Sequence, residues 1–182
     1  MNRFAEEMIV QHGAPTLAKL KPANLFSCEG NCYQCEDVSR CSRQLNRAGV
    51  CLRTMHFNGK RSLMLVYRAE LLWAHLEQPE VQEFLRPLGY SGTLEQHLHH
   101  LQKRIHFCGG FPHEIGLFLG YPLEDVVGFM RNQGRNYKLC GYWKVYGDAE
   151  RARALFRSFT GCRETLLRHY RNGTKLSRLC IG

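Results

Sequence analysis

The first clear pattern along the chain is a pair of apolar runs that favour strands. Residues 50–57 and 63–67 are rich in strand-forming residues, and Asn58-Gly59-Lys60 lies between them. An Asn-Gly pair between two such runs is typical of a tight hairpin turn. We therefore expect two antiparallel strands in this region.

The N-terminal region begins as a short helical pattern. Gly13 and Pro15 interrupt it, and both residue types disfavour the interior of a helix. We expect the helix to end there, and an extended apolar stretch to follow as far as Phe26.

Apolar residues recur every three or four positions through much of the remaining chain, which predicts helices. The clearest case is the segment from Thr93, the expected cap, to Ile105, where the repeat makes one apolar stripe. Further helices are expected over Glu36–Ala48, Ala69–Glu77 and Pro79–Leu85, and from the cap residue Asp148 to about Arg171. Between these elements, residues 111–129 predict two short helices joined by Gly120-Tyr121-Pro122.

Residues 137–146 (YKLCGYWKVY) are rich in aromatics and predict a further strand. Alternation would place one set of side chains in the core: Tyr137, Leu139, Gly141, Trp143 and Val145. The opposite face would carry Lys138, Cys140, Tyr142, Lys144 and Tyr146, and its two lysines could line an anion-binding surface.

Together the elements predict an α+β fold, with a small, mainly antiparallel sheet of three to four strands covered by several helices. The chain has 182 residues, of which 44% are hydrophobic, so it can bury a sizeable core. We expect one domain over residues 1–182. No apolar run is long enough to span a bilayer, and acidic residues interrupt the N-terminal segment where a signal peptide would continue, so a cytoplasmic location is expected.

The net charge of +9 comes from one part of the chain. Residues 1–130 carry 13 basic and 13 acidic side chains, whereas residues 131–182 carry 12 basic and 3 acidic ones. A partner drawn by long-range attraction should therefore meet the C-terminal third first.

Four segments carry a family resemblance: HGAPTLAKLKPANLF, LMLVYRAELL, FPHEIGLFLGYPLEDVVGF and GYWKVYGDAERARALF. In this order they resemble a family of anaerobic Gram-positive bacteria that is catalogued as a domain of unknown function. The resemblance covers most of the chain and implies only a redox or iron-homeostasis setting. Two features depart from the family: His12-Gly13 stands where His-Cys is expected, and the cysteine cluster described next is an addition.

The segment 28–41 is rich in cysteine. Cys28, Cys32 and Cys35 form a CxxxCxxC motif, and Cys41 follows. Four thiolates at this spacing can bind one zinc ion or one [4Fe-4S] cluster. Radical enzymes that use S-adenosylmethionine share the triplet but have a much larger barrel, so that class is excluded. The alternative is a set of ordinary reduced cysteines.

A second candidate site is the pair His113 and Glu114. An imidazole beside a carboxylate could act as a general base pair or bind a metal, which would make the protein an enzyme. Acidic groups near helix starts also serve as caps, and this structural interpretation is favoured.

The C-terminal helix, residues 148–171, predicts a basic amphipathic surface. Four arginines share one stripe of this helix: Arg153, Arg157, Arg168 and Arg171. A solvated face is the simplest interpretation, and phosphate-bearing ligands, nucleic acid or an acidic partner such as a flavodoxin are the alternatives. The helix–Gly-Tyr-Pro–helix segment resembles a helix-turn-helix in outline, which supports the hypothesis of a nucleic-acid-binding regulator.

Four histidines in 97–106 are expected on a solvated polar helix face, because they point to different flanks: His97, His99, His100 and His106. The leading functional hypothesis is a cytosolic binding or accessory protein of anaerobic redox or iron metabolism, with a metal at the four cysteines.

Overall fold

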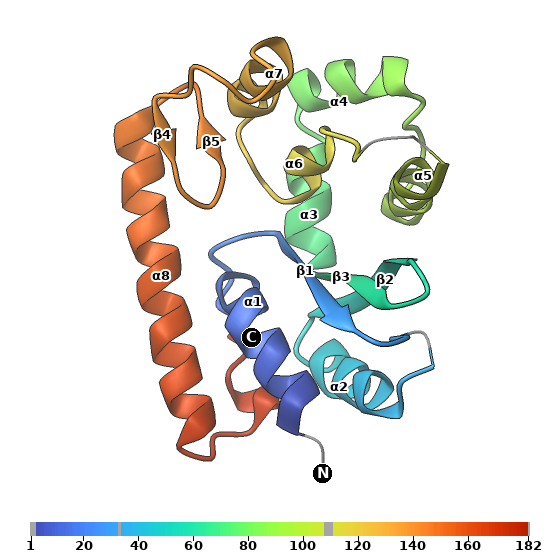
Figure 1. The fold of residues 1–182 in the computed structure, drawn as a ribbon, viewed down its shortest axis with the longest axis vertical. Helices are drawn as coiled ribbons and strands as arrows, with labels where there is room; N and C mark the ends of the chain where they lie inside the picture. The colour runs from blue at the N-terminus through green and yellow to red at the C-terminus, as the bar shows by residue number, and fades with distance from the viewer. Residues whose placement is uncertain (1–2, 33, 108–110, 182) are drawn as a thin grey trace. The chain divides into compact units, whose positions relative to one another are not determined.

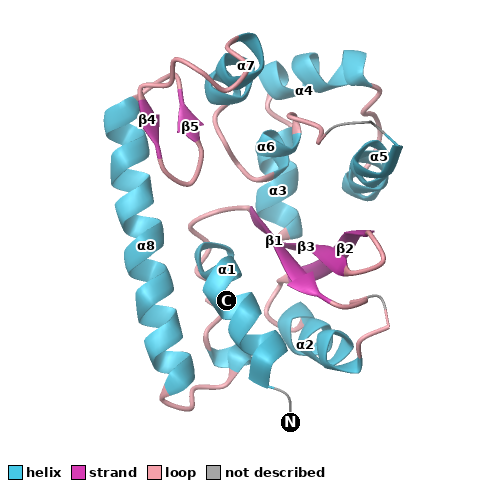
Figure 2. Ribbon diagram, in the orientation of Figure 1, coloured by secondary structure: helices cyan, strands magenta, loops and turns pink. Residues whose placement is uncertain are grey.

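The computed structural model describes residues 3–32, 34–107 and 111–181 (Figure 1). The chain folds into two compact units, the first made of residues up to 71 together with 161 onward, and the second of residues 72–160. The boundaries fall inside α3 (Ala69–Leu76) and α8 (Ala149–Arg171), so each of these helices contributes to both units. Each unit contains helices and one small sheet (Figure 2), which confirms the α+β class.

The first unit contains a three-stranded antiparallel sheet with the order β1-β3-β2. The strands are β1 (Ala23–Glu29), β2 (Cys51–Phe57) and β3 (Arg61–Tyr67). The expected hairpin joins β2 to β3, and the Asn58 Oδ1 atom accepts hydrogen bonds from the backbone amides of Lys60 and Arg61. Gly59 has φ of 88°, the left-handed conformation that this turn requires. The predicted antiparallel pair is confirmed.

Helices α1 (Arg3–Leu17) and α2 (Glu36–Asn46) pack on one face of this sheet. Phe26 pairs with Met64 across β1 and β3, and both side chains belong to the core that these helices cover. The C-terminal segment adds η2 (Leu176–Arg178), whose Leu176 is fully buried in the same core. Apolar burial on this face therefore holds the first unit together.

The predicted end of the first helix at Gly13 and Pro15 is wrong. Helix α1 continues to Leu17, with Pro15 inside it. A Cβ atom at position 13 would lie 2.9 Å from the Val66 Cγ1 atom, so glycine allows the helix to approach β3 closely. The buried guanidinium of Arg68 donates to the carbonyls of Thr16 and Leu17, at 2.7 and 2.6 Å. Tertiary contacts outweigh the local preference here.

The second unit is mainly helical. Its elements are α4 (Pro79–Leu85), η1 (Arg86–Leu88), α5 (Leu94–Phe107), α6 (Ile115–Phe118), α7 (Leu123–Arg131), β4 (Leu139–Cys140) and β5 (Lys144–Val145). The two short helices around Gly120-Tyr121-Pro122 are confirmed as α6 and α7. Within α5, His97 is only 1% exposed and the Nδ1 atom of its ring lies 3.0 Å from the Thr93 carbonyl oxygen. The predicted solvated face is therefore wrong for His97, which lies among aromatic rings of the core.

The single strand predicted over 137–146 is also wrong. The segment is a hairpin of two-residue strands, β4 and β5, and the Gly141 amide donates to the Trp143 carbonyl at 3.1 Å. A Cβ atom at position 141 would lie 2.3 Å from the Phe156 ring, so the close contact with α8 requires glycine at the turn. Because the segment folds back on itself, its side chains do not alternate between core and surface as predicted. Trp143 is buried as expected, whereas Tyr137 is 45% exposed.

Helix α8 begins as predicted. The Asp148 Oδ1 atom accepts a hydrogen bond from the Arg151 amide at 2.9 Å, which caps the helix. In the described part of the chain, no helix combines the length and the apolar character that a bilayer crossing needs.

Candidate functional site

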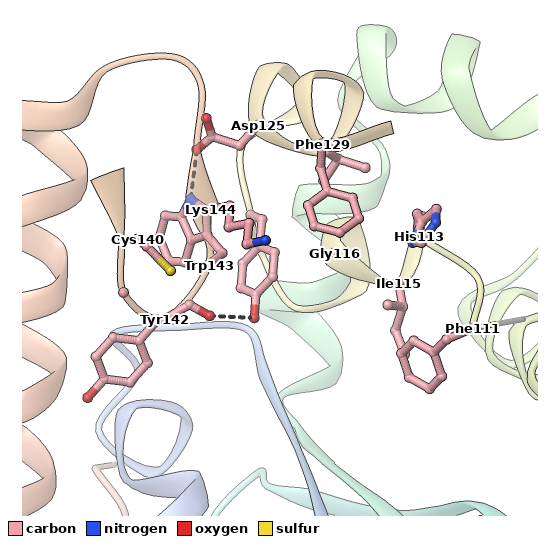
Figure 3. Close-up of a pocket in the computed structure, with 13 residues that line it drawn as sticks. Phe111, His113, Ile115, Gly116, Asp125, Phe129, Cys140, Tyr142, Trp143 and Lys144 are labelled. Carbon is pink, nitrogen blue, oxygen red and sulfur yellow. Dashed lines mark hydrogen bonds between the residues drawn. The ribbon is translucent and has the colours of Figure 1, made fainter. Parts of the chain in front are cut away.

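The second unit contains an apolar cavity of about 380 Å³, which is within the range of small-molecule pockets. It is formed by α6, α7, the β4–β5 hairpin and the segment before α6 (Figure 3). Six apolar side chains line it: Phe111, Ile115, Tyr121, Val126, Phe129 and Trp143. The polar side chains in the lining are those of His113, Asp125, Cys140, Tyr142 and Lys144. The cavity is therefore an aromatic pocket with a few polar groups.

Two stacked rings, Tyr121 and Trp143, form part of the pocket wall. Their centroids are 4.7 Å apart and their planes differ by 26°. Burial raises the pKa of Tyr121 to about 12, so its hydroxyl stays protonated and donates to the Tyr142 carbonyl at 3.3 Å. A Cβ atom at position 116 would lie 3.0 Å from the Tyr121 ring and 2.8 Å from Val126, so Gly116 leaves the space that this arrangement needs.

Asp125 fixes the hairpin against α7. Its Oδ2 atom accepts from the Trp143 indole nitrogen at 2.7 Å, and its Oδ1 atom accepts from the amides of Tyr146 and Gly147, at 2.7 and 2.9 Å. The side chain is nearly fully buried. Three donors bind this carboxylate, so its role is to position the indole ring that lines the pocket.

Lys144 brings a positive charge to the pocket. Its Nζ atom donates to the Gly134 carbonyl at 2.8 Å and lies over the rings of Phe129 and Tyr137, at 5.8 and 5.1 Å from their centroids. An ammonium group has three donors, so this carbonyl does not use all of them. Lys144, predicted to bind anions, thus belongs to the pocket. Lys138 is exposed, and its Nζ atom donates to the Gly147 carbonyl at 2.9 Å.

The side chains of the predicted pair, His113 and Glu114, lie in different surroundings. His113 is exposed and lines the pocket, with its ring centroid 5.1 Å from that of Phe129. Glu114 is 2% exposed, pairs with Arg104 and accepts a hydrogen bond from the Tyr90 hydroxyl at 3.0 Å. Consecutive residues at a helix start point in different directions, so the two side chains reach different surroundings.

The predicted metal ligands lie in the first unit. Cys28, Cys32 and Cys35 line one cavity of about 140 Å³, and Cys41 is buried in the adjoining core. Burial, the largest effect, raises the pKa of Cys28 to about 12 and that of Cys41 to about 11. Over residues 3–32, 34–107 and 111–181, no group of three or more His, Cys, Asp or Glu side chains is placed to hold a metal ion. The four-cysteine site stays a prediction.

Two of the four arginines in the basic stripe predicted on α8 form ion pairs. Arg153 forms an ion pair with Glu150, and Arg171 donates to the Glu7 carboxylate at 2.9 Å. Arg157 and Arg168 are exposed on the same helix. Helix α6 has only four residues, which is too short for the first helix of a helix-turn-helix.

Comparison with known protein families matches residues 9–180 to the family described as "Protein of unknown function (DUF3793)". The chain belongs to this family. The match confirms the expected membership in a domain family of unknown function, and the matched range includes every residue of the aromatic pocket. Comparison with the curated proteins and with the solved structures finds no match to this chain.

Sequence reasoning missed the pocket walls. Phe111, Tyr121 and Phe129 are spread over one block, and Trp143 was expected only as a core residue. The available signal was the presence of glycines, Gly116 and Gly141, close in the sequence to these rings. A glycine that admits an aromatic ring is recognised only once the two segments are seen together.

Proposed function

We propose that this protein binds a small planar aromatic molecule that carries a negatively charged group, and that the pocket of Figure 3 is its binding site. The observation that carries the proposal is the combination of aromatic walls with the Lys144 ammonium in one cavity. Aromatic rings favour stacking with a planar ligand, and the ammonium favours an anionic substituent.

The state of the acidic groups supports a binding role. Both Asp125 oxygens are held by protein donors, and Glu114 is engaged with Arg104 and Tyr90. Apart from Asp125, the polar side chains that line the pocket are His113 and Lys144, together with the Cys140 thiol and the Tyr142 phenol. This environment suits an anion better than a cation.

A flavin is a suitable probe because one ring system is available with and without a phosphate. We expect flavin mononucleotide to bind with quenching of the flavin fluorescence, since the ring would stack beside Trp143, and riboflavin to bind about tenfold more weakly for lack of the charge, a difference of about 1.4 kcal/mol. Equal affinities would contradict the anionic part of the proposal. If neither flavin mononucleotide nor riboflavin binds, the ligand of the pocket is not a flavin.

Substitution of the lysine tests the site itself. Lys144→Met should weaken flavin mononucleotide binding by about tenfold and leave riboflavin binding nearly unchanged, because a charge-assisted contact contributes roughly 1.5 kcal/mol or more. Lys138→Met is the matched control, since Lys138 lies on the same hairpin and outside the pocket lining. If the two variants bind alike, Lys144 does not contact the ligand.

A second function rests on the cysteines: binding of zinc or a [4Fe-4S] cluster by Cys28, Cys32, Cys35 and Cys41, within anaerobic redox or iron metabolism. It is favoured by the gathering of three of these thiols around one cavity. Anaerobic purification should then give about one metal ion or cluster per chain by elemental analysis, with visible absorption for the cluster only. Metal-free protein that folds normally would exclude this function.

A further inference from the structure

The two sulfur atoms of Cys28 and Cys32 lie 2.8 Å apart in the first unit. Cys28 is near the end of β1, and Cys32 follows in the loop before α2. Both side chains are buried, at 9% and 7% exposure. Two reduced thiols in such close contact need only a small approach to reach bonding distance.

The turn between the two cysteines is held by Ser62. This side chain is fully buried on β3, and its residue is the cross-strand partner of Cys28. The Ser62 hydroxyl donates to the Gly30 carbonyl at 2.7 Å and accepts from the Cys32 amide at 2.9 Å. The Gly30 amide donates to the Lys60 carbonyl at 2.9 Å. Strand β3 and its hairpin therefore fix the geometry that brings the sulfurs together.

The cavity beside the sulfurs limits what can reach them. It encloses about 140 Å³ and is lined mainly by apolar side chains, including Phe26 and Leu52. Such a volume can admit a molecule the size of hydrogen peroxide, whereas a peptide disulfide would need the loop to open. A small uncharged oxidant is therefore the fitting reagent.

We propose that Cys28 and Cys32 form a peroxide-reactive dithiol that closes to a disulfide. In the first step one of the two sulfurs attacks one peroxide oxygen, the O–O bond breaks, and the products are a sulfenic acid on that cysteine and one water. In the second step the sulfur of the other cysteine attacks the sulfenic acid sulfur, the S–O bond breaks, and the hydroxyl leaves with the thiol proton as a second water. The two thiols lose two electrons in total, and the peroxide accepts them.

Closure would remove two of the four predicted metal ligands, since a disulfide offers no thiolate.

Digestion with a glutamate-specific protease shows directly which cysteines the disulfide joins. Glu29 separates Cys28 from Cys32, whereas Cys32 and Cys35 remain on one peptide that ends at Glu36. The full chain would be treated with one equivalent of hydrogen peroxide in the presence of a chelator, and free thiols would then be alkylated before digestion. We expect a loss of two titratable thiols and a covalent link between the peptides 8–29 and 30–36.

Variants and a second oxidant complete the test. Cys35→Ser should keep the linked peptides, and Cys32→Ser should abolish them. Oxidised glutathione at equal concentration should react at least about tenfold more slowly, because the cavity excludes it. The peptide map of the natural chain decides the main point even if a variant fails to fold. Separate peptides, a link through Cys35, or unchanged thiols would overturn the proposal, and equal rates with glutathione would overturn the choice of oxidant.

Discussion

Lys21 gives a prediction about stability that depends on pH. It lies between α1 and β1 and is only 4% exposed. Burial lowers the pKa of its ammonium group from 10.5 to about 7. In the unfolded chain the group returns to water, so there it binds a proton up to about pH 10.4. Between about pH 7 and 10 the unfolded state therefore holds more protons than the folded state.

The sign and size follow from proton linkage. Stability rises with pH wherever the unfolded state binds more protons, with a slope of about 1.4 kcal/mol per pH unit for one group. The pKa shift lowers the free energy of unfolding by about 4 kcal/mol at pH 7 and by about 3 kcal/mol at pH 8.5. Above about pH 9 the buried thiols oppose this trend, because burial raises the pKa of Cys28 and Cys41 and the unfolded chain then loses their protons first.

A comparison of variants isolates Lys21 from these other groups. Lys21→Met removes the charge and keeps the length of the side chain. Urea unfolding of both proteins from pH 7 to 8.5 should show the variant as the more stable at pH 7, with an advantage that shrinks by roughly 1–2 kcal/mol over this range. Lys21 also has a contact with the protein that the variant loses, so the change with pH is a safer measure than the absolute gain.

Lys60→Met is the control, because Lys60 is exposed in the β2–β3 turn of the same unit. The difference in free energy of unfolding between Lys60→Met and the natural chain should not change with pH. A constant difference for Lys21→Met as well would refute the reasoning, since it would mean that the folded protein does not lower the pKa of Lys21.

Three further substitutions test the structural supports of the pocket and of α8, each by urea unfolding. Gly116→Ala should destabilise the protein by about 1–3 kcal/mol, because the new methyl group would lie 2.8 Å from Val126; unchanged stability would mean that the packing around α6 is looser than described. Asp125→Ala should cost about 3 kcal/mol or more, since buried donors, the Trp143 indole among them, lose their acceptor; a loss below about 1 kcal/mol would contradict that role. Asp148→Ala should cost about 1 kcal/mol through loss of the helix cap, whereas Asp148→Asn should restore most of it; equal losses in both variants would argue against a capping bond.

Local chemistry made several elements predictable from the sequence. The β2–β3 hairpin follows from Asn58-Gly59, since the asparagine side chain and the glycine conformation are properties of the turn itself. The start of α8 follows from Asp148 for the same reason. These features depend on residues within a few positions of one another, so no knowledge of the fold was needed.

The errors have a common cause in contacts between distant segments. Helix α1 passes through Gly13 and Pro15 because it packs on β3 and because Arg68 binds its last carbonyls. The segment 137–146 folds back because Gly141 allows contact with Phe156. In both cases packing and hydrogen bonds exceed a local preference of about 1–3 kcal/mol, and the sequence pattern does not contain those partners.

For the sites, the amino-acid sequence alone supplies the chemical groups: thiols in 28–41, two lysines in 137–146, and an imidazole beside a carboxylate at 113–114. Which of these groups meet depends on the tertiary structure. It placed Lys144 and His113 in an aromatic pocket, buried Glu114 against Arg104, and brought the sulfurs of two cysteines into contact across a turn held by a neighbouring strand. The physical reason is that a residue's type is local, whereas its neighbours, and with them its charge state and reactivity, depend on the packing of segments far apart in the chain.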